Sequence, residues 1–216
     1  MPAWLRWTIL LPLGFAAGIY IGLNDFSVQK GILLLGVFLL AFALFGLSAF
    51  HTVFRTQNTG KVEAYLRRTR ARHPQNGLVL DAANGDFDAV ERAIPRICNK
   101  MARTSALVSL HLERQELAQA QRIVDEVQPA SNRNYYKALI SILEGDFQRA
   151  EEYKAGIRSK ALQHVIDAEI AFKQGKPEEA DQAGQLALAA AGGVQKFVLM
   201  RSLERQRSNP SRRMYF

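Results

Sequence analysis

The chain has 216 residues, and its 28 Lys and Arg against 20 Asp and Glu give a formal net charge of +8. The positive charge is unevenly spread, because residues 75–200 carry 15 Lys and Arg but 17 Asp and Glu. A nucleic-acid-binding domain usually carries its basic side chains on the folded part, so this distribution argues against a nucleic-acid partner. The single cysteine, Cys98, excludes an internal disulfide.

The first 54 residues hold only three charged side chains and contain two long apolar runs. Residues 4–23 and 31–53 are each long enough to cross a hydrocarbon core of ~30 Å as a helix. Because seven residues join them, residues 1–54 are predicted to form a two-helix transmembrane hairpin, with a cleaved signal peptide as the alternative for the first run. Three glycines spaced four apart would let the first span pack closely against the second span or another helix: Gly14, Gly18 and Gly22.

A basic segment at residues 55–74 follows and is predicted to be a juxtamembrane linker with a helix near 61–72. Its six basic side chains are opposed only by Glu63, so the positive-inside rule predicts that both termini and the rest of the chain are cytoplasmic. We therefore expect an integral protein of a bacterial-type inner or plasma membrane. The same basic side chains are expected to contact anionic lipid headgroups: Arg55, Lys61, Arg67, Arg68, Arg70 and Arg72.

A short signature returns every 30 residues from Gly85 onward. Its four copies begin at residues 85, 115, 145 and 175 and read GDFDAV, QELAQA, GDFQRA and GKPEEA. Apolar residues recur five residues before each start and five and twelve residues after it, which indicates two packed helices per unit. One unit cannot bury these stripes alone, so the units are predicted to stack as helical hairpins.

The turn inside each unit has the chemistry of one helix ending and another beginning. Gly85 and Gly145 suit a left-handed residue after the first helix, and Asp86 and Asp146 suit the N-cap of the second. These residues resemble the inter-helix turn of the tetratricopeptide repeat, Gly-Asp-Phe-x-x-Ala, which is complete at 145–150. The resemblance implies stacked helix pairs whose first helices line a concave, protein-binding face, although the period of 30 is shorter than that family's period of about 34.

After Gly192 and Gly193, residues 194–205 are predicted to form an amphipathic helix that covers the open end of the stack. The repeats and this cap together occupy residues 75–207, and residues 208–216 are predicted to be a basic, disordered tail. The predicted fold class is therefore all-α. It combines a transmembrane hairpin with a short α-solenoid of about four tetratricopeptide-like hairpins and a capping helix.

No phosphate-binding loop, dinucleotide-binding turn or zinc-ligand pattern occurs in the sequence, so we expect no cofactor, no metal and no enzymatic activity. Cys98 is expected in the late, apolar part of a helix, as a buried structural thiol. His164 and Asp167, three residues apart, are expected to form a surface pair. The resemblance makes polar and aromatic residues of the first helices the candidates for contact with a partner: Arg103, His111, Asn134, Tyr135 and His164.

Binding is the function that these features favour. We expect a membrane-anchored adaptor that recruits or organises a protein partner at the cytoplasmic face of the membrane. The alternative is an accessory subunit of a membrane enzyme or transporter, bound through the three spaced glycines of the first span. The identity of the partner, and whether the chain forms a homo-oligomer, stay open at this level.

Overall fold

The computed structural model describes four stretches of the chain: residues 32, 36, 50–208 and 214–216. The predicted span at 4–23, with its three spaced glycines, lies outside the described residues, as does nearly all of the span at 31–53. By its internal contacts the chain divides into two units, Met1–Phe50 and His51–Phe216, and every helix discussed below belongs to the second.

Within the described residues, none of the helices combines the length and the apolar character that crossing a bilayer requires. The longest helix with described bounds is α12 (Gly193–Ser208), which has 16 residues and carries charged side chains such as Arg205 and Arg207. At ~1.5 Å per residue it extends over only ~24 Å. We predicted an integral protein of the inner membrane, with both termini and the repeat domain in the cytoplasm. This finding contradicts that localisation, and the prediction was wrong.

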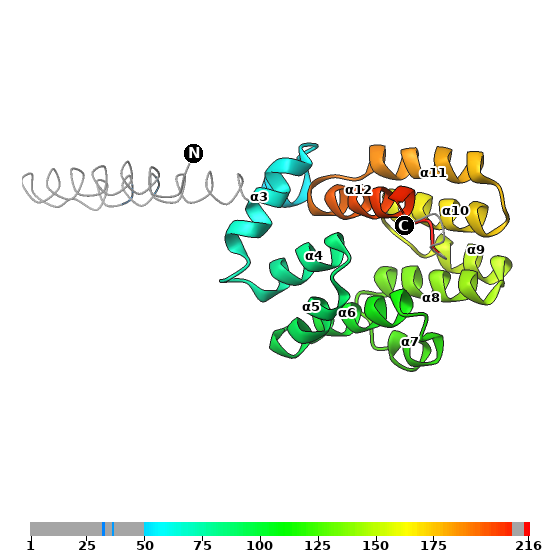
Figure 1. Ribbon diagram of the computed structural model, residues 1–216, viewed down its shortest axis with the longest axis horizontal. Helices are drawn as coiled ribbons and strands as arrows, with labels where there is room; N and C mark the ends of the chain where they lie inside the picture. Colours follow the sequence, from blue (N-terminus) through cyan, green and yellow to red (C-terminus); the bar gives the residue numbers. More distant parts are fainter. Residues whose placement is uncertain (1–31, 33–35, 37–49, 209–213) are drawn as a thin grey trace, which may run out of the picture. The chain divides into compact units, whose positions relative to one another are not determined.

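The regular structure of the described residues is entirely helical, which confirms the predicted all-α class (Figure 1). The chain runs from α3 (Thr59–Thr69) to α12, and the helices between them pack in sequential pairs. These pairs are α4 (Pro74–Asn84) with α5 (Phe87–Ala93), α6 (Lys100–Glu113) with α7 (Leu117–Val124), α8 (Ala130–Glu144) with α9 (Phe147–Ala155), and α10 (Lys160–Lys173) with α11 (Pro177–Ala190).

The residue that starts each repeat has a left-handed backbone in all four copies. Its φ angle is 79° at Gly85, 61° at Gln115, 85° at Gly145 and 72° at Gly175. The next residue caps the following helix where it is aspartate: Asp86 and Asp146 accept the backbone N–H three residues further on, at 2.9 and 3.0 Å. The turn chemistry predicted from the sequence is thus confirmed, and it extends to Gln115.

The repeated apolar columns form the core that joins the pairs. Two columns, five and twelve residues after each repeat start, are almost inaccessible to solvent throughout: Val90, Ala120, Ala150, Ala180, Ile97, Val127, Ile157 and Ala187. Neighbouring pairs pack through these columns, with α8 contacting both α6 and α10. The stacking predicted from the period is therefore present.

Cys98 departs from its prediction. Pro95 ends α5 and turns the chain into the short 3-10 helix η1 (Ile94–Arg96), because proline cannot donate the backbone hydrogen bond that would continue the helix. Cys98 consequently lies in the loop before α6, where it is exposed rather than buried.

The segment predicted to be a juxtamembrane linker with a helix near 61–72 does contain a helix, α3, but this helix is part of the folded unit. Val62 and Leu66 of α3 are buried in one cluster with Leu80 of α4 and Phe197 of α12. The six basic residues expected at lipid headgroups are all exposed, and two of them form ion pairs: Arg67 with Glu63 at 2.7 Å and Arg70 with Asp81 at 3.2 Å.

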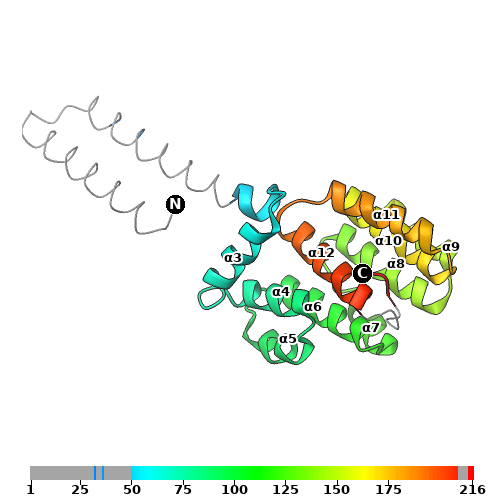
Figure 2. The same ribbon diagram turned by 45° about the horizontal axis from the view of Figure 1, so that its top comes forward.

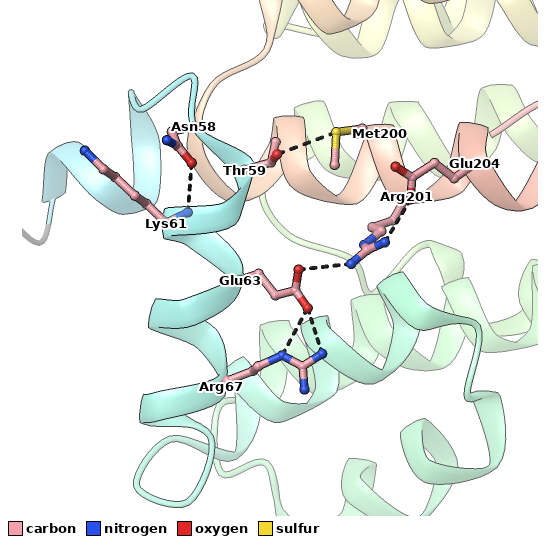
Figure 3. Close-up of polar contacts among 8 residues, drawn as sticks. All are labelled: Asn58, Thr59, Lys61, Glu63, Arg67, Met200, Arg201 and Glu204. Atoms are coloured by element: carbon pink, nitrogen blue, oxygen red, sulfur yellow. Dashed lines mark hydrogen bonds and ion pairs between the residues drawn. The ribbon is translucent and has the colours of Figure 1, made fainter.

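Polar contacts complete the packing of α3 against α12 (Figure 3). The carboxylate of Glu63 accepts hydrogen bonds from Arg67 at 2.7 Å and from Arg201 of α12 at 2.9 Å. Arg201 also bonds Glu204, again at 2.9 Å. The hydrogen bond from Arg67, aided by Arg201, holds the pKa of Glu63 below its usual range, so this carboxylate stays ionised between the two helices.

The last helix does more than cover the open end of the fourth pair. It contacts α11, but it also packs against α3 and α4 at the other end of the stack, and Figure 2 shows it crossing the middle of the helices. Arg205 donates to the carbonyls of Ala82 and Ala83, the last turn of α4, at 2.7 and 2.5 Å. The predicted cap therefore connects the first helices of this unit to the last.

Candidate binding site

Glu169 of α10 is a deeply buried carboxylate with buried apolar neighbours. It is 1% exposed and lies beside the buried residues Ala168 and Ile170. A carboxylate removed from water needs hydrogen-bond donors. Two of them come from the end of the chain: the N–H of Tyr215 donates to Oε2 at 2.9 Å and the N–H of Phe216 to Oε1 at 2.8 Å.

The aromatic side chains of these last two residues are buried as well. Tyr215 and Phe216 are 5% and 7% exposed and share a core cluster with Val165, Ala187 and Leu199. The Tyr215 ring lies 5.7 Å from the ring of Phe172 and 5.2 Å from that of Phe216, the latter in a T-shaped arrangement.

The tail predicted to be disordered thus ends in an ordered, non-helical segment, Met214 to Phe216. The physical reason is that two buried aromatic rings and two hydrogen bonds to a carboxylate offset the entropy of ordering three residues. Residues 209–213 of the same predicted tail lie outside the described residues.

Helix α11 supplies both space and a polar partner for Tyr215. A Cβ atom at Gly184 would lie 2.9 Å from Cε1 of Tyr215 and 3.1 Å from its hydroxyl, so only glycine leaves room for the ring in this position. One turn earlier, Asp181 accepts a hydrogen bond from the Tyr215 hydroxyl. We call Glu169, Phe172, Asp181 and Gly184 together the tail site.

The electrostatics of the tail site favour hydrogen-bond donors over anionic groups. Burial, followed by the hydrogen bond to Asp181, raises the pKa of Tyr215 well above its usual range. Burial likewise raises the pKa of Tyr135, and Tyr136 and the carboxylates of Glu169 and Glu113 raise it further. Both phenols therefore stay protonated at neutral pH. Two carboxylates that face the bound segment suit N–H and O–H donors and disfavour an anionic ligand.

Tyr135 is a predicted contact residue whose described contacts reach the cluster around the tail segment. On α8 it packs against the apolar cluster that contains Tyr215 and Phe216. Its neighbour Asn134 lies beside the end of α9, with its Nδ2 atom 2.0 Å from where a Cβ of Gly156 would be.

The described contacts of the other three predicted contact residues do not include the residues of the tail site. Arg103 is exposed on α6. The Nδ1 atom of His111 lies 2.6 Å from Oε2 of Glu116, within the turn of its own hairpin. His164 lies 3.4 Å from Asp167, which confirms the predicted surface pair.

Glu169 and Gly184 were missed in the sequence, although each differs in type from the residues at the same place in the other copies. The other copies have Val79, Ser109 and Leu139 at the position of Glu169, and Ile94, Val124 and Lys154 at the position of Gly184. The available signals were an acidic residue at a position where the other copies have Val, Ser and Leu, and a glycine in the interior of a helix. Their shared occupant could not be foreseen, because it lies more than 30 residues away in the chain.

A pocket of about 210 Å³ lies among α7, α8 and α9. Two of its charged groups pair with each other: Lys137 lies 2.6 Å from Asp125, and it also lies 5.7 Å from the ring centre of Tyr153. The hydrogen bond from Lys137 lowers the pKa of Asp125. Over residues 50–208 and 214–216, no group of His, Cys, Asp and Glu side chains is arranged to hold a metal ion.

Comparisons with protein-family models, with curated proteins and with solved structures gave no match for this chain. The functional argument therefore starts from the tail site itself.

Proposed function

We propose that the helical pairs form a divergent tetratricopeptide-like α-solenoid that acts as an adaptor and binds a segment of a partner protein. The observation that carries this proposal is the occupied tail site, in which Glu169 holds two successive backbone N–H groups. Every residue except proline presents the same donor. A site that holds one short segment in this way has the chemistry to hold a segment of another protein.

The repeat pattern supports the same function. In helical solenoids, binding surfaces are assembled from residues of successive units rather than from one loop. Tyr135 of the third pair and Glu169 and Asp181 of the fourth pair follow this arrangement. The link from solenoid to binding is an analogy between folds, whereas the carboxylate and the glycine gap are features of this chain.

A chain that ends at Arg213 provides the test, because its tail site lacks its own occupant. We expect a library of random displayed peptides selected on this variant to converge on related sequences. Their dissociation constants should be on the order of 1 to 10 μM, the range of short peptides that bury a few side chains. Failure of the library to converge would contradict the proposal.

Two substitutions then locate the bound peptides. Phe172→Ala removes the ring that borders the Tyr215 side chain and should weaken the selected peptides about tenfold. Leu186→Ala serves as the control, because Leu186 is on α11 but 53% exposed, and it should leave their affinity unchanged. Peptides that respond equally to both substitutions would bind elsewhere on the chain and would also contradict the proposal.

A further inference from the structure

We infer that the tail site recognises a partner segment in which a tyrosine is followed directly by a second aromatic residue, and that Tyr215 and Phe216 compete with that segment for the site. The inference rests on the adaptor function proposed above. It specifies which residues the partner segment must contain, and it gives a means by which the chain regulates its own binding.

Selectivity for tyrosine follows from the two groups that α11 contributes. Gly184 leaves a gap that fits a six-membered ring, with Tyr215 Cε1 only 2.9 Å from where a Cβ would be. Asp181 accepts the hydroxyl hydrogen of that ring. A phenylalanine would fill the gap but leave Asp181 without this donor, and a small side chain would leave the gap empty.

The second position requires an aromatic side chain and a backbone N–H. Phe216 is 7% exposed, and its ring forms a T-shaped pair with the Tyr215 ring at a centroid distance of 5.2 Å. Its N–H donates to Oε1 of Glu169 while the N–H of Tyr215 donates to Oε2. Since both residues donate, proline is excluded at each of the two positions.

Met214 to Phe216 can leave this site without unfolding a helix, because these residues are non-helical. Their departure would deprive the almost fully buried Glu169 of two donors and open an apolar gap beside Phe172 and Gly184. The empty site is therefore unfavourable and favours refilling by a segment of the same chemistry. The attached tail competes at an effective concentration in the millimolar range, which weakens any partner that binds in its place.

A labelled peptide with the sequence of residues 208–216, Ser-Asn-Pro-Ser-Arg-Arg-Met-Tyr-Phe, is the probe for a test by fluorescence anisotropy. It is titrated into the full chain, into the chain ending at Arg213, and into a full-length chain carrying Tyr215→Ser and Phe216→Ser. Both altered chains should bind the probe at least about tenfold more tightly than the full chain, since their tails no longer compete. Equal affinity for all three chains would overturn the inference.

The partner chemistry is tested with a second peptide in which phenylalanine replaces the tyrosine. The chain ending at Arg213 should prefer the tyrosine peptide by about fivefold. Asp181→Ala in that chain should abolish the preference, whereas Gln182→Ala, at the adjacent exposed position of α11, should preserve it. A preference that survives Asp181→Ala would refute the assigned role of this carboxylate.

The two proposals fail in different ways. If the library converges on peptides without a tyrosine–aromatic pair, the adaptor function stands and the inference fails. If no peptide binds, both fail. Loss of helical circular dichroism in both altered chains would mean that the tail is a permanent part of the core, which also overturns the inference.

Discussion

Gln115 has a φ of 61° at a turn where the other three repeats have glycine. In this left-handed region the Cβ atom of an ordinary residue lies too close to the following carbonyl oxygen, at a cost of ~1 kcal/mol. The periodic packing on either side of the turn holds the backbone in this conformation, so the second repeat keeps the geometry of the others without their glycine.

Replacing this residue should therefore stabilise the protein. Gln115→Gly is expected to raise the free energy of unfolding by about 0.5 to 1 kcal/mol, because glycine adopts the left-handed region freely. The same substitution at Gln119, exposed within α7, should lower it by a similar amount because glycine is a poor helix former. Urea unfolding measures both, and a loss of stability at position 115 would contradict the assigned backbone strain.

At the scale of elements, the turn between α11 and α12 meets the segment that precedes α3. The N–H of Gly193 donates to the carbonyl of Thr56 at 2.8 Å. A Cβ atom at Gly193 would lie 1.9 Å from the carbonyl oxygen of Val53, at a φ of 56°. This close approach of two backbones lets α12 turn back toward α3.

A matched pair of substitutions separates the contact from the backbone conformation. Gly175→Ala places a Cβ at a φ of 72° with no atom within 4 Å, so it should cost only the left-handed penalty of about 1 kcal/mol. Gly193→Ala should cost at least about 2 kcal/mol, because it must also push the two backbones apart. Equal losses in thermal or urea unfolding would contradict the docking of residues 53–56 on this turn.

Helix α11 and the tail are coupled through Gly184. Alanine in a helix interior makes the helix ~1 kcal/mol more stable than glycine does. Gly184→Ala should therefore raise the free energy of unfolding of the chain ending at Arg213 by about 1 kcal/mol. In the full chain the added methyl group collides with the Tyr215 ring, and the gain should vanish or reverse. The difference between the two backgrounds measures the coupling, and identical effects in both would show that Tyr215 does not occupy this gap.

These elements also mark what the sequence could and could not predict. The conformation of the turns at Gly85 and Gly145 depends on residues that are close in sequence, including the capping aspartates. The apolar columns recur with the 30-residue period. Both could therefore be derived from the sequence. Pro95 is a local signal as well, because a proline at this position predicts the end of α5 and thus a loop position for Cys98.

At the scale of the whole folded unit, the decisive contacts join residues far apart in the chain. The hydroxyl of Thr59 contacts the sulfur of Met200 at 3.6 Å across 141 positions, and Arg201 meets Glu63 across 138. Periodicity carries no information about such pairs. The return of α12 to α3 and the occupant of the tail site could not be derived from it, although Glu169 and Gly184 stood out in their columns.

Amide hydrogen exchange of Tyr215 and Phe216, followed by nuclear magnetic resonance in the full-length protein, tests the central claim most directly. If both N–H groups are bonded to the buried Glu169, they should exchange at least about tenfold more slowly than in the free peptide. Saturation with the peptide of residues 208–216 should abolish that protection. Exchange at the free-peptide rate in the protein alone, or protection that saturating peptide leaves unchanged, would contradict the account of the tail site.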